Sequence, residues 1–594
     1  MSLLQRRIPS VRQFQFLFGI LLLLPLLSFP QNCPTDPPKN PFLADSPWPI
    51  YHRNNFAQSS TCLRGPQEGD SLAIKFRGEI KGGTSPWVYI SEPYPNGDRV
   101  LYYSNSTHVF KFIDNGVKLL AIDSLRIDFD PFTSFGWNFL LAKQKIWYTY
   151  DPKYDPADDE YTKLYKLTDA DTMNAYSDIV AIDTFDFGTY EVNRVQHFSL
   201  NYWGEIVFHS DNNTDSLYGT IGIISQDFQL LDTLRYPTTA DEITNHNAFP
   251  IDENNSLYIT TNKRLLKFDW DGTALSLAWE APYDFVADGP VGTFAEGSGT
   301  TPTLLGWGAE NDKLVVMSDG HAKNNLVAFW RELPDGWTGV PGMDIHFADS
   351  IRLPAAQTFS NQFQSIENSP TAFGYDIGIA QFNGFLGYDC ENLKGVQKVS
   401  WDTASNEFKI AWVNRQVNMN GVLTYSQGSN IVYGSGKEAT CNYYYYGLDW
   451  ETGEVVFRQL LGPEGTFLND PFYDAGNNHV IDEEGNIYFA GGASIVKMEI
   501  VERAPVDTMT THLISTLLPE IRIFPNPTHQ VFTIEGVEVI ECMSLWDMQG
   551  KEWPLTTWGE GRYSMGEAPD GIYVLKIGTG TETFTHKMIQ CRRQ

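Results

Sequence analysis

A unit of roughly 40–55 residues recurs along the middle of the chain, and this repeat restricts the possible folds more than any other feature of the sequence. Each copy contains a turn, a strand with aromatic residues, a polar turn and a strand that ends at an Asp-rich hairpin. The clearest copies begin near Ile251, Phe385, Asn430 and Ile481, and weaker copies lie near 99–122, 137–166, 196–234 and 312–331. Each has room for four short strands, and 35–500 contains no amphipathic helix of three turns. The repeat therefore predicts an all-β fold, a β-propeller of about eight blades, with seven or six as alternatives.

Composition supports short strands and narrows the class of partner. Aromatic residues make up 14% of the chain, which also contains 49 Gly and 33 Pro, as strands separated by many turns require. The formal net charge is −31, and no basic footprint is visible, so we expect no nucleic-acid partner. The acidity is explained by solubility outside the cell or by cation binding, and total charge does not decide between them.

The N-terminus has the features of an export signal. Arg6, Arg7 and Arg12 precede the apolar run Phe16–Phe29, and polar residues follow from Gln31. A basic region before a short apolar stretch is typical of a secretory signal peptide, predicted here at 1–31. No later stretch is apolar enough to cross a bilayer, so we expect no transmembrane span after signal removal.

The C-terminus predicts a separate small domain at 521–594, after a linker at 501–520 and a propeller domain at 32–500. Short alternating strands are divided by turns at Pro525-Asn526-Pro527, Gln549-Gly550 and Asp570-Gly571, the pattern of a small Ig-like β-sandwich. The order of pieces resembles the C-terminal sorting domain of the type IX (Por) secretion system. The residues that carry this resemblance are Pro525, Asn526, Pro527, Gly550, Lys551, Gly571, Tyr573 and Lys576.

This resemblance implies where the protein is delivered, but not what it binds or which reaction it catalyses. It implies Sec export, recognition of the tail by the type IX machinery, translocation across the outer membrane, and secretion or display at the cell surface. Ala568-Pro569 departs from the Leu-containing lead-in that is commoner in the family.

Two segments of the middle region resemble PQQ-like propeller repeats. Leu448–Phe457 (LDWETGEVVF) is similar to the hairpin of that repeat, and Ser46–Asn55 (SPWPIYHRNN) is similar to its lead strand. Quinone dehydrogenases of this type place two adjacent cysteines over the cofactor, and no adjacent cysteines occur here. The resemblance therefore implies the blade architecture without the cofactor.

Candidate functional residues lie beside glycines and before expected inner strands, which would let them face the propeller axis at the channel mouth. They are His246, Asn247, Ser298, Thr300, Asp319, His321, Glu367 and Asn368. Oxygen atoms from several blades could hold Ca²⁺, which takes six to eight oxygen ligands. Alternatively, Gly297–Thr301 is a tight turn whose hydroxyls cap backbone groups, and the histidines are structural.

These observations leave three functions open. The first is binding of a polysaccharide, protein or small molecule at the channel mouth. The second is an extracellular propeller enzyme, a metal-assisted lactonase-like hydrolase or a lyase, with catalytic residues that the sequence does not identify. The third is a structural or adhesive surface protein.

The six cysteines predict disulfides in an exported chain. The chain-order pairing is Cys33 with Cys62, Cys390 with Cys441, and Cys542 with Cys591, because each pair then falls within one expected domain. No thiolate spacing typical of zinc occurs.

Peptide mapping of the secreted protein under non-reducing conditions tests the pairing. We expect three linked peptide pairs that separate after reduction. A crossed pair, or Cys62 recovered as a free thiol, would contradict it.

Overall fold

The computed structural model describes residues 36–590 with gaps, and its two compact units, Met1–Ala504 and Pro505–Gln594, are described separately. The described ranges are 36–77, 80, 87–105, 107–126, 139–151, 161–192, 195–210, 217–239, 242, 247–284, 297–308, 312–321, 324–355, 368–380, 395–419, 421–463, 472, 478–491, 494–503, 522–524, 531–535, 542–547, 551–557, 562–566, 568–579 and 582–590. The predicted signal peptide, 1–31, lies outside them.

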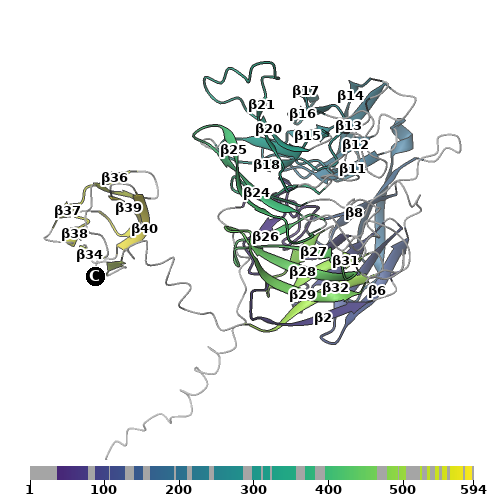
Figure 1. Ribbon diagram of the computed structural model, residues 1–594, viewed down its shortest axis with the longest axis horizontal. Coiled ribbons are helices and arrows are strands. Elements are labelled where there is room, and N and C mark those ends of the chain that lie inside the picture. Colours follow the sequence, from purple (N-terminus) through teal and green to yellow (C-terminus); the bar gives the residue numbers. More distant parts are fainter. Residues whose placement is uncertain are drawn as a thin grey trace, which may run out of the picture. The chain divides into compact units, whose positions relative to one another are not determined.

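The first unit is a β-propeller, as the repeat predicted. Its described residues form eight small sheets, one per blade, taken in chain order, and every strand pair is antiparallel except β1 with β26 (Figure 1). Blade 1 consists of β3 (Trp87–Ile90), β4 (Val100–Ser104), β5 (His108–Asp114) and β6 (Leu119–Arg126), and blade 2 consists of β7 (Phe139–Leu141), β8 (Trp147–Asp151), β9 (Lys163–Asp169) and β10 (Ile179–Asp186). Blade 3 consists of β11 (Val195–Leu200), β12 (Ile206–Ser210), β13 (Tyr218–Ile224) and β14 (Leu230–Pro237), and blade 4 consists of β15 (Leu257–Thr260), β16 (Arg264–Trp270) and β17 (Leu275–Pro282). A 3-10 turn, η2 (Phe187–Tyr190), follows β10.

Blades 5 to 8 continue the order, and the last two also take strands from the N-terminus. Blade 5 consists of β18 (Thr303–Leu305), β19 (Leu314–Ser318), β20 (Asn325–Trp330) and β21 (Phe347–Arg352), and blade 6 consists of β22 (Thr371–Phe373), β23 (Asp376–Ala380), β24 (Val396–Asp402) and β25 (Glu407–Asn414). Blade 7 consists of β26 (Thr424–Ser426), β27 (Ile431–Lys437), β28 (Asn442–Asp449) and β29 (Val455–Pro463) with β1 (Ser60–Thr61). Blade 8 consists of β30 (His479–Ile481), β31 (Ile487–Gly491) and β32 (Ser494–Glu502) with β2 (Ser71–Arg77).

Pairing between β2 and β32 closes the ring. The two strands are antiparallel, with Ile74 opposite Met498, so the outer strand of blade 8 comes from the N-terminal side of blade 1. In Figure 1 the purple β2 accordingly lies against green strands of the C-terminal blade. Closure joins residues more than 400 positions apart, which the repeat pattern alone does not reveal.

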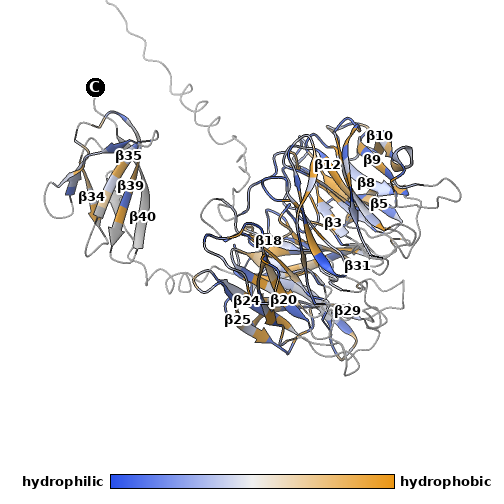
Figure 2. Ribbon diagram, turned by 90° about the horizontal axis from the view of Figure 1, so that it is seen from above, coloured by the Kyte–Doolittle hydropathy of each residue, from blue (hydrophilic) through white to orange (hydrophobic). Residues whose placement is uncertain are grey.

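Burial falls from the first to the fourth strand of a blade. Every residue of β7 is buried, whereas β14 alternates between half-buried and exposed positions. The first strand packs between neighbouring blades and the axis, and the fourth has one face in water. Hydrophobic residues therefore follow the strands and hydrophilic residues gather at the turns (Figure 2).

The repeated Asp of the first hairpin is a turn cap. Asp252 Oδ1 accepts hydrogen bonds from the backbone N–H of Asn254 and Ser256, and its Oδ2 accepts from the Tyr258 hydroxyl at 2.8 Å. Asp482 repeats this arrangement with Tyr488 in blade 8. The two clearest copies of the repeat therefore form the same type of hairpin. In each, the Asp carboxylate accepts hydrogen bonds from backbone N–H groups of the turn.

A lysine in the third strand of several blades joins each blade to the next. Lys111 Nζ lies 2.5 Å from Asp169 Oδ1 of blade 2, with both side chains fully buried. Lys497 of blade 8 pairs with Asp114 of blade 1 at 2.6 Å. Lys166, Lys267 and Lys398 also reach acceptors on the following blade. Lys111 and Lys497 are buried and pair with carboxylates on the next sheet, so loss of either carboxylate would leave a buried charge without its partner.

Residues 36–63 do not form the predicted lead strand; they follow an irregular path across one end of the ring. Ser46–Asn55 consists of bends and turns, so the expectation of a strand there was wrong. The segment instead supplies hydrogen bonds to the first-strand region of successive blades. These bonds are Ile90 N–H to Trp48 O, Leu141 N–H to Pro49 O, Asn55 Nδ2 to Leu200 O, Ile251 N–H to Asn55 O, Leu304 N–H to Phe56 O, Ala372 N–H to Gln58 O and Tyr425 N–H to Ser59 O.

The second unit is a small β-sandwich of two four-stranded sheets, as predicted. One contains β33 (Arg522–Phe524), β34 (Val531–Glu535), β37 (Thr556–Thr557) and β38 (Arg562–Ser564); the other contains β35 (Cys542–Asp547), β36 (Glu552–Trp553), β39 (Gly571–Thr579) and β40 (Glu582–Gln590). Phe532, Leu545 and Tyr573 lie in its core. Lys551 precedes β36, and Gly571, Tyr573 and Lys576 lie in β39, whereas Pro525–Pro527 and Gly550 lie outside the described residues.

Removing one partner of the buried lysine pair should destabilise the propeller strongly. We expect Asp169→Ala to lower the free energy of unfolding by about 3–5 kcal/mol, because Lys111 would keep a buried charge without its carboxylate. Lys111→Met combined with Asp169→Leu should recover most of the loss. Urea unfolding measures both; Lys409→Ala, at a pair whose lysine side chain is 59% exposed, is the control and should change little. An Asp169→Ala variant as stable as this control would contradict the interpretation.

Candidate functional site

The described candidates from the sequence lie at one edge of the blades. Asn247, Ser298, Thr300 and Asn368 precede first-strand regions, and Asp319 and His321 follow the second strand of blade 5. In an antiparallel blade the start of the first strand and the end of the second share an edge. His246 and Glu367 lie outside the described residues, so their convergence with the others stays a prediction.

Most of the described candidates are engaged in holding turns. Asp319 is buried and accepts hydrogen bonds from Asn325 N–H at 2.8 Å and from Asn325 Nδ2 at 2.6 Å. Ser298 and Thr300 are also fully buried, their hydroxyls are 3.1 Å apart, and Thr300 Oγ1 accepts from Ser318 N–H. Asn368 is buried, and its Nδ2 donates a hydrogen bond to Ala380 O at 3.4 Å. Asn247 is half-buried and His321 is exposed. The polar atoms of the Gly297–Thr301 turn therefore mainly satisfy backbone groups.

The channel interior is filled by side chains from the N-terminal segment. The Tyr51 ring lies 4.4 Å from the ring of Trp87 in blade 1 and 6.3 Å from that of His197 in blade 3. Its hydroxyl is 3.2 Å from Thr301 Oγ1, which precedes blade 5. Groups from opposite blades meet on Tyr51, so this residue and its neighbour His52 occupy the axis.

Burial suppresses ionisation along this axis. Desolvation lowers the pKa of His52 to about 3, with a smaller effect from neighbouring His197, and lowers the pKa of His197 itself to about 3. Burial raises the pKa of Tyr51 to about 12. All three groups are neutral near pH 7, and His52 Nδ1 lies 2.6 Å from Ser59 Oγ.

The same segment has an unusual backbone. His52, Arg53, Ala57 and Ser59 have φ values of 54°, 74°, 56° and 51°, in the left-handed region. Each such residue costs roughly 1–2 kcal/mol relative to the right-handed conformation. Burial of Trp48, Ile50, Tyr51 and Phe56, together with the bonds to successive blades, offsets that cost.

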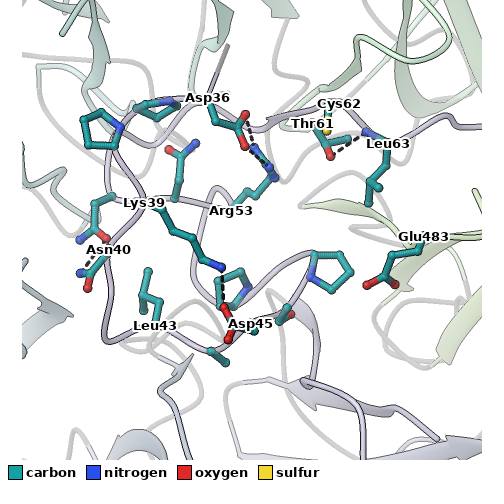
Figure 3. A pocket seen from close by; sticks show the side chains of 18 of the residues that line it. Asp36, Lys39, Asn40, Leu43, Asp45, Arg53, Thr61, Cys62, Leu63 and Glu483 are labelled. Carbon is teal, nitrogen blue, oxygen red and sulfur yellow. Dashed lines mark hydrogen bonds and ion pairs between the residues drawn. The ribbon is translucent and has the colours of Figure 1, made fainter. Parts of the chain in front are cut away.

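A cleft of about 560 Å³ lies between this segment and the first-hairpin turns of blades 1 and 8 (Figure 3). The first strands end at this face, so it lies opposite the edge that holds the sequence-predicted residues. Residues of 36–63 form most of its walls, and Pro93, Arg99 and Glu483 come from the hairpins of blades 1 and 8.

The walls of the cleft contain three ion pairs and five prolines. Arg53 Nη1 and Nη2 contact Asp36 at 3.0 and 2.5 Å, Lys39 pairs with Asp45, and Arg99 pairs with Glu483 across blades 1 and 8. The prolines are Pro37, Pro38, Pro47, Pro49 and Pro93. Fixed φ angles and paired charges preorganise these walls.

Sequence reasoning missed the cleft residues. They lie in an irregular stretch without strand or helix periodicity, and their proximity depends on ring closure between blades 1 and 8. The one available signal was the density of proline and charged residues in 36–49, just after the predicted signal peptide.

Cys62 lines the cleft, and both Cys62 and Cys441 are disulfide-bonded. Cys33, Cys390 and Cys591 lie outside the described residues, so the pairing stays a prediction. Within the described ranges, no three His, Cys, Asp or Glu side chains are placed to hold a metal ion. The calcium expectation included His246 and Glu367 and is therefore not tested.

Comparisons with known proteins identify the tail. Residues 522–590 match the family model described as the secretion system C-terminal sorting domain. This match agrees with the motif order in the sequence and with the separate β-sandwich. Among the described residues, no helix has the length and apolar character needed to span a membrane.

The propeller region has more distant similarities. An uncharacterized protein from Archaeoglobus fulgidus is 25% identical over 476 residues, which cover 74% of this chain and 86% of that protein. A europium-containing methanol dehydrogenase is 9% identical with a TM-score of 0.47, covering 74% of this chain and 88% of its own. A putative 6-phosphogluconolactonase from Bacteroides fragilis is 13% identical with a TM-score of 0.36, covering 64% and 94%. The fold assignment rests on the strand topology rather than on these structures.

Fold and tail together define the class of protein. The chain is a cargo of the type IX secretion system, a β-propeller carrying a C-terminal sorting domain that directs it to the cell surface or the medium. The sorting domain implies contact with the secretion machinery.

The buried histidines predict acid sensitivity. His52, His197 and His479 each have a pKa of about 3, against 6.5 in the unfolded chain. Because the unfolded state binds these protons first, their contribution is complete above about pH 6.5 and is lost as pH falls towards 3, at roughly 1.4 kcal/mol per pH unit for each histidine.

His479→Phe should reduce the stability difference between pH 7 and pH 5 by about 2 kcal/mol, measured by urea unfolding. His321→Gln, at an exposed position, is the control. Equal pH dependence in both variants would show that His479 is not held neutral.

Proposed function

We propose that the exported propeller is a binding protein whose ligand occupies this cleft. The observation that carries this proposal is the cleft itself, which is about 560 Å³ in volume and lies between the N-terminal segment and the hairpins of blades 1 and 8. Cavities of this size with a few placed polar groups suit small ligands or the end of a larger chain.

The rigidity of the cleft supports binding. Its floor is tied to first-strand regions around the ring, and its walls contain five prolines and three ion pairs. A preformed site loses little conformational freedom when a ligand enters. At the other edge, Ser298, Thr300 and Asp319 are engaged in turns, so the described geometry favours binding over turnover.

A crystallographic fragment screen on the full chain tests the proposal. We expect fragments to occupy the cleft, and Pro93→Trp to abolish their occupancy, because Pro93 is an exposed wall residue and an indole there would fill the space. Pro341→Trp, at an exposed proline outside the cleft lining, is the matched control and should leave occupancy unchanged. A screen in which fragments bind elsewhere and leave the cleft empty would contradict the proposal.

A further inference from the structure

The cleft is balanced in formal charge, but its arginines and its carboxylates differ in the hydrogen-bonding capacity that their existing contacts leave unused. Its lining contains three cations, Lys39, Arg53 and Arg99, and three carboxylates, Asp36, Asp45 and Glu483. Figure 3 shows the three carboxylates on different sides of the cleft. Which ligand fits depends on how many donors and acceptors the existing contacts leave unused.

The arginine donors are largely committed to protein acceptors. Arg53 donates to both oxygens of Asp36 and to Ser60 O. Arg99 donates through Nη1 to Ser91 O at 2.6 Å and through Nη2 to Glu483. Arg53 and Arg99 side chains are only 13% and 24% exposed, so both mainly hold the walls in place.

The carboxylates keep more capacity than the arginines. A carboxylate accepts about four hydrogen bonds. Among the described residues, Glu483 has one cationic partner, Arg99, and its side chain is 41% exposed. Asp45 contacts Lys39 closely and Lys143 only at 3.9 Å, and it is 48% exposed. The accessible unused sites at Glu483 and Asp45 are therefore acceptors.

The electrostatic field of the negatively charged protein also favours a positively charged ligand. A formal net charge of −31 concentrates cations near the surface and accelerates their association. Partial burial raises the pKa of Glu483, so a second cationic partner would relieve an existing electrostatic cost. The described lining has no aromatic ring, so it offers no platform for stacking a base or a sugar.

We infer that the cleft takes a cationic ligand, an ammonium or guanidinium group, bound between Glu483 and Asp45. This inference rests on the proposed function, because it names the chemistry of the same cleft. The group can come from a basic peptide or from a free polyamine, and both present several N–H donors on a positive charge.

Calorimetric titration of the full chain with triarginine, spermidine and triglutamate separates the possibilities. We expect one site for a cationic probe, at least about tenfold weaker in Glu483→Gln and in Asp45→Asn. Glu407→Gln removes an exposed carboxylate elsewhere and is the matched control for attraction by net charge. Preference for triarginine over spermidine would assign the peptide source, and the reverse would assign the polyamine.

The failures of the two proposals are distinguishable. Equal binding of the cations to Glu483→Gln and Glu407→Gln would overturn the cationic assignment. One-site binding of triglutamate that Pro93→Trp and Lys39→Met both remove would overturn the cationic assignment but support a binding cleft. Cation binding that survives Pro93→Trp would place the ligand outside the cleft and overturn both.

Discussion

The architecture depends on hydrogen bonds between one irregular segment, 36–63, and the first-strand regions of successive blades. A propeller leaves the inner ends of its sheets facing a channel, where unpaired backbone groups are costly once water is excluded. Here Trp48 O, Asn55 O, Phe56 O and Ser59 O accept bonds from four different blades. The segment thereby satisfies backbone groups of several blades and buries Trp48, Ile50 and Tyr51 in the core.

This arrangement also accounts for the site. Tyr51 contacts groups of blades 1, 3 and 5, so it lies near the axis, and the cleft lies beside the same segment. The left-handed residues at 52, 53, 57 and 59 mark the sharp turns that let one short stretch face several blades. The same stretch thus contacts several blades and forms most of the cleft walls.

Blade architecture was predictable because it is encoded locally and repeatedly. Asp252 and Asp482 begin the same hairpin, and each bonds a tyrosine six residues later, so the chemistry of one copy recurs in another. The sorting domain was recognisable for the same reason, since its turns and strands follow in a fixed order. The site was not predictable in this way. Ser298, Thr300 and Asp319 stay predictions of the sequence, and in the structure their side chains hold turns at the opposite edge of the blades.

The sequence by itself determined that the chain carries a C-terminal sorting domain for export and folds as a β-propeller of about eight blades. Local periodicity and turn chemistry suffice for the blades, whereas the resemblance of the tail to a known sorting-domain family supplies the export address. Only the tertiary structure decided that Arg99 and Glu483, 384 residues apart, line one cleft with Asp36 and Asp45. The physical reason is ring closure: pairing of β2 with β32 brings the first and last blades together, and no local pattern records that contact.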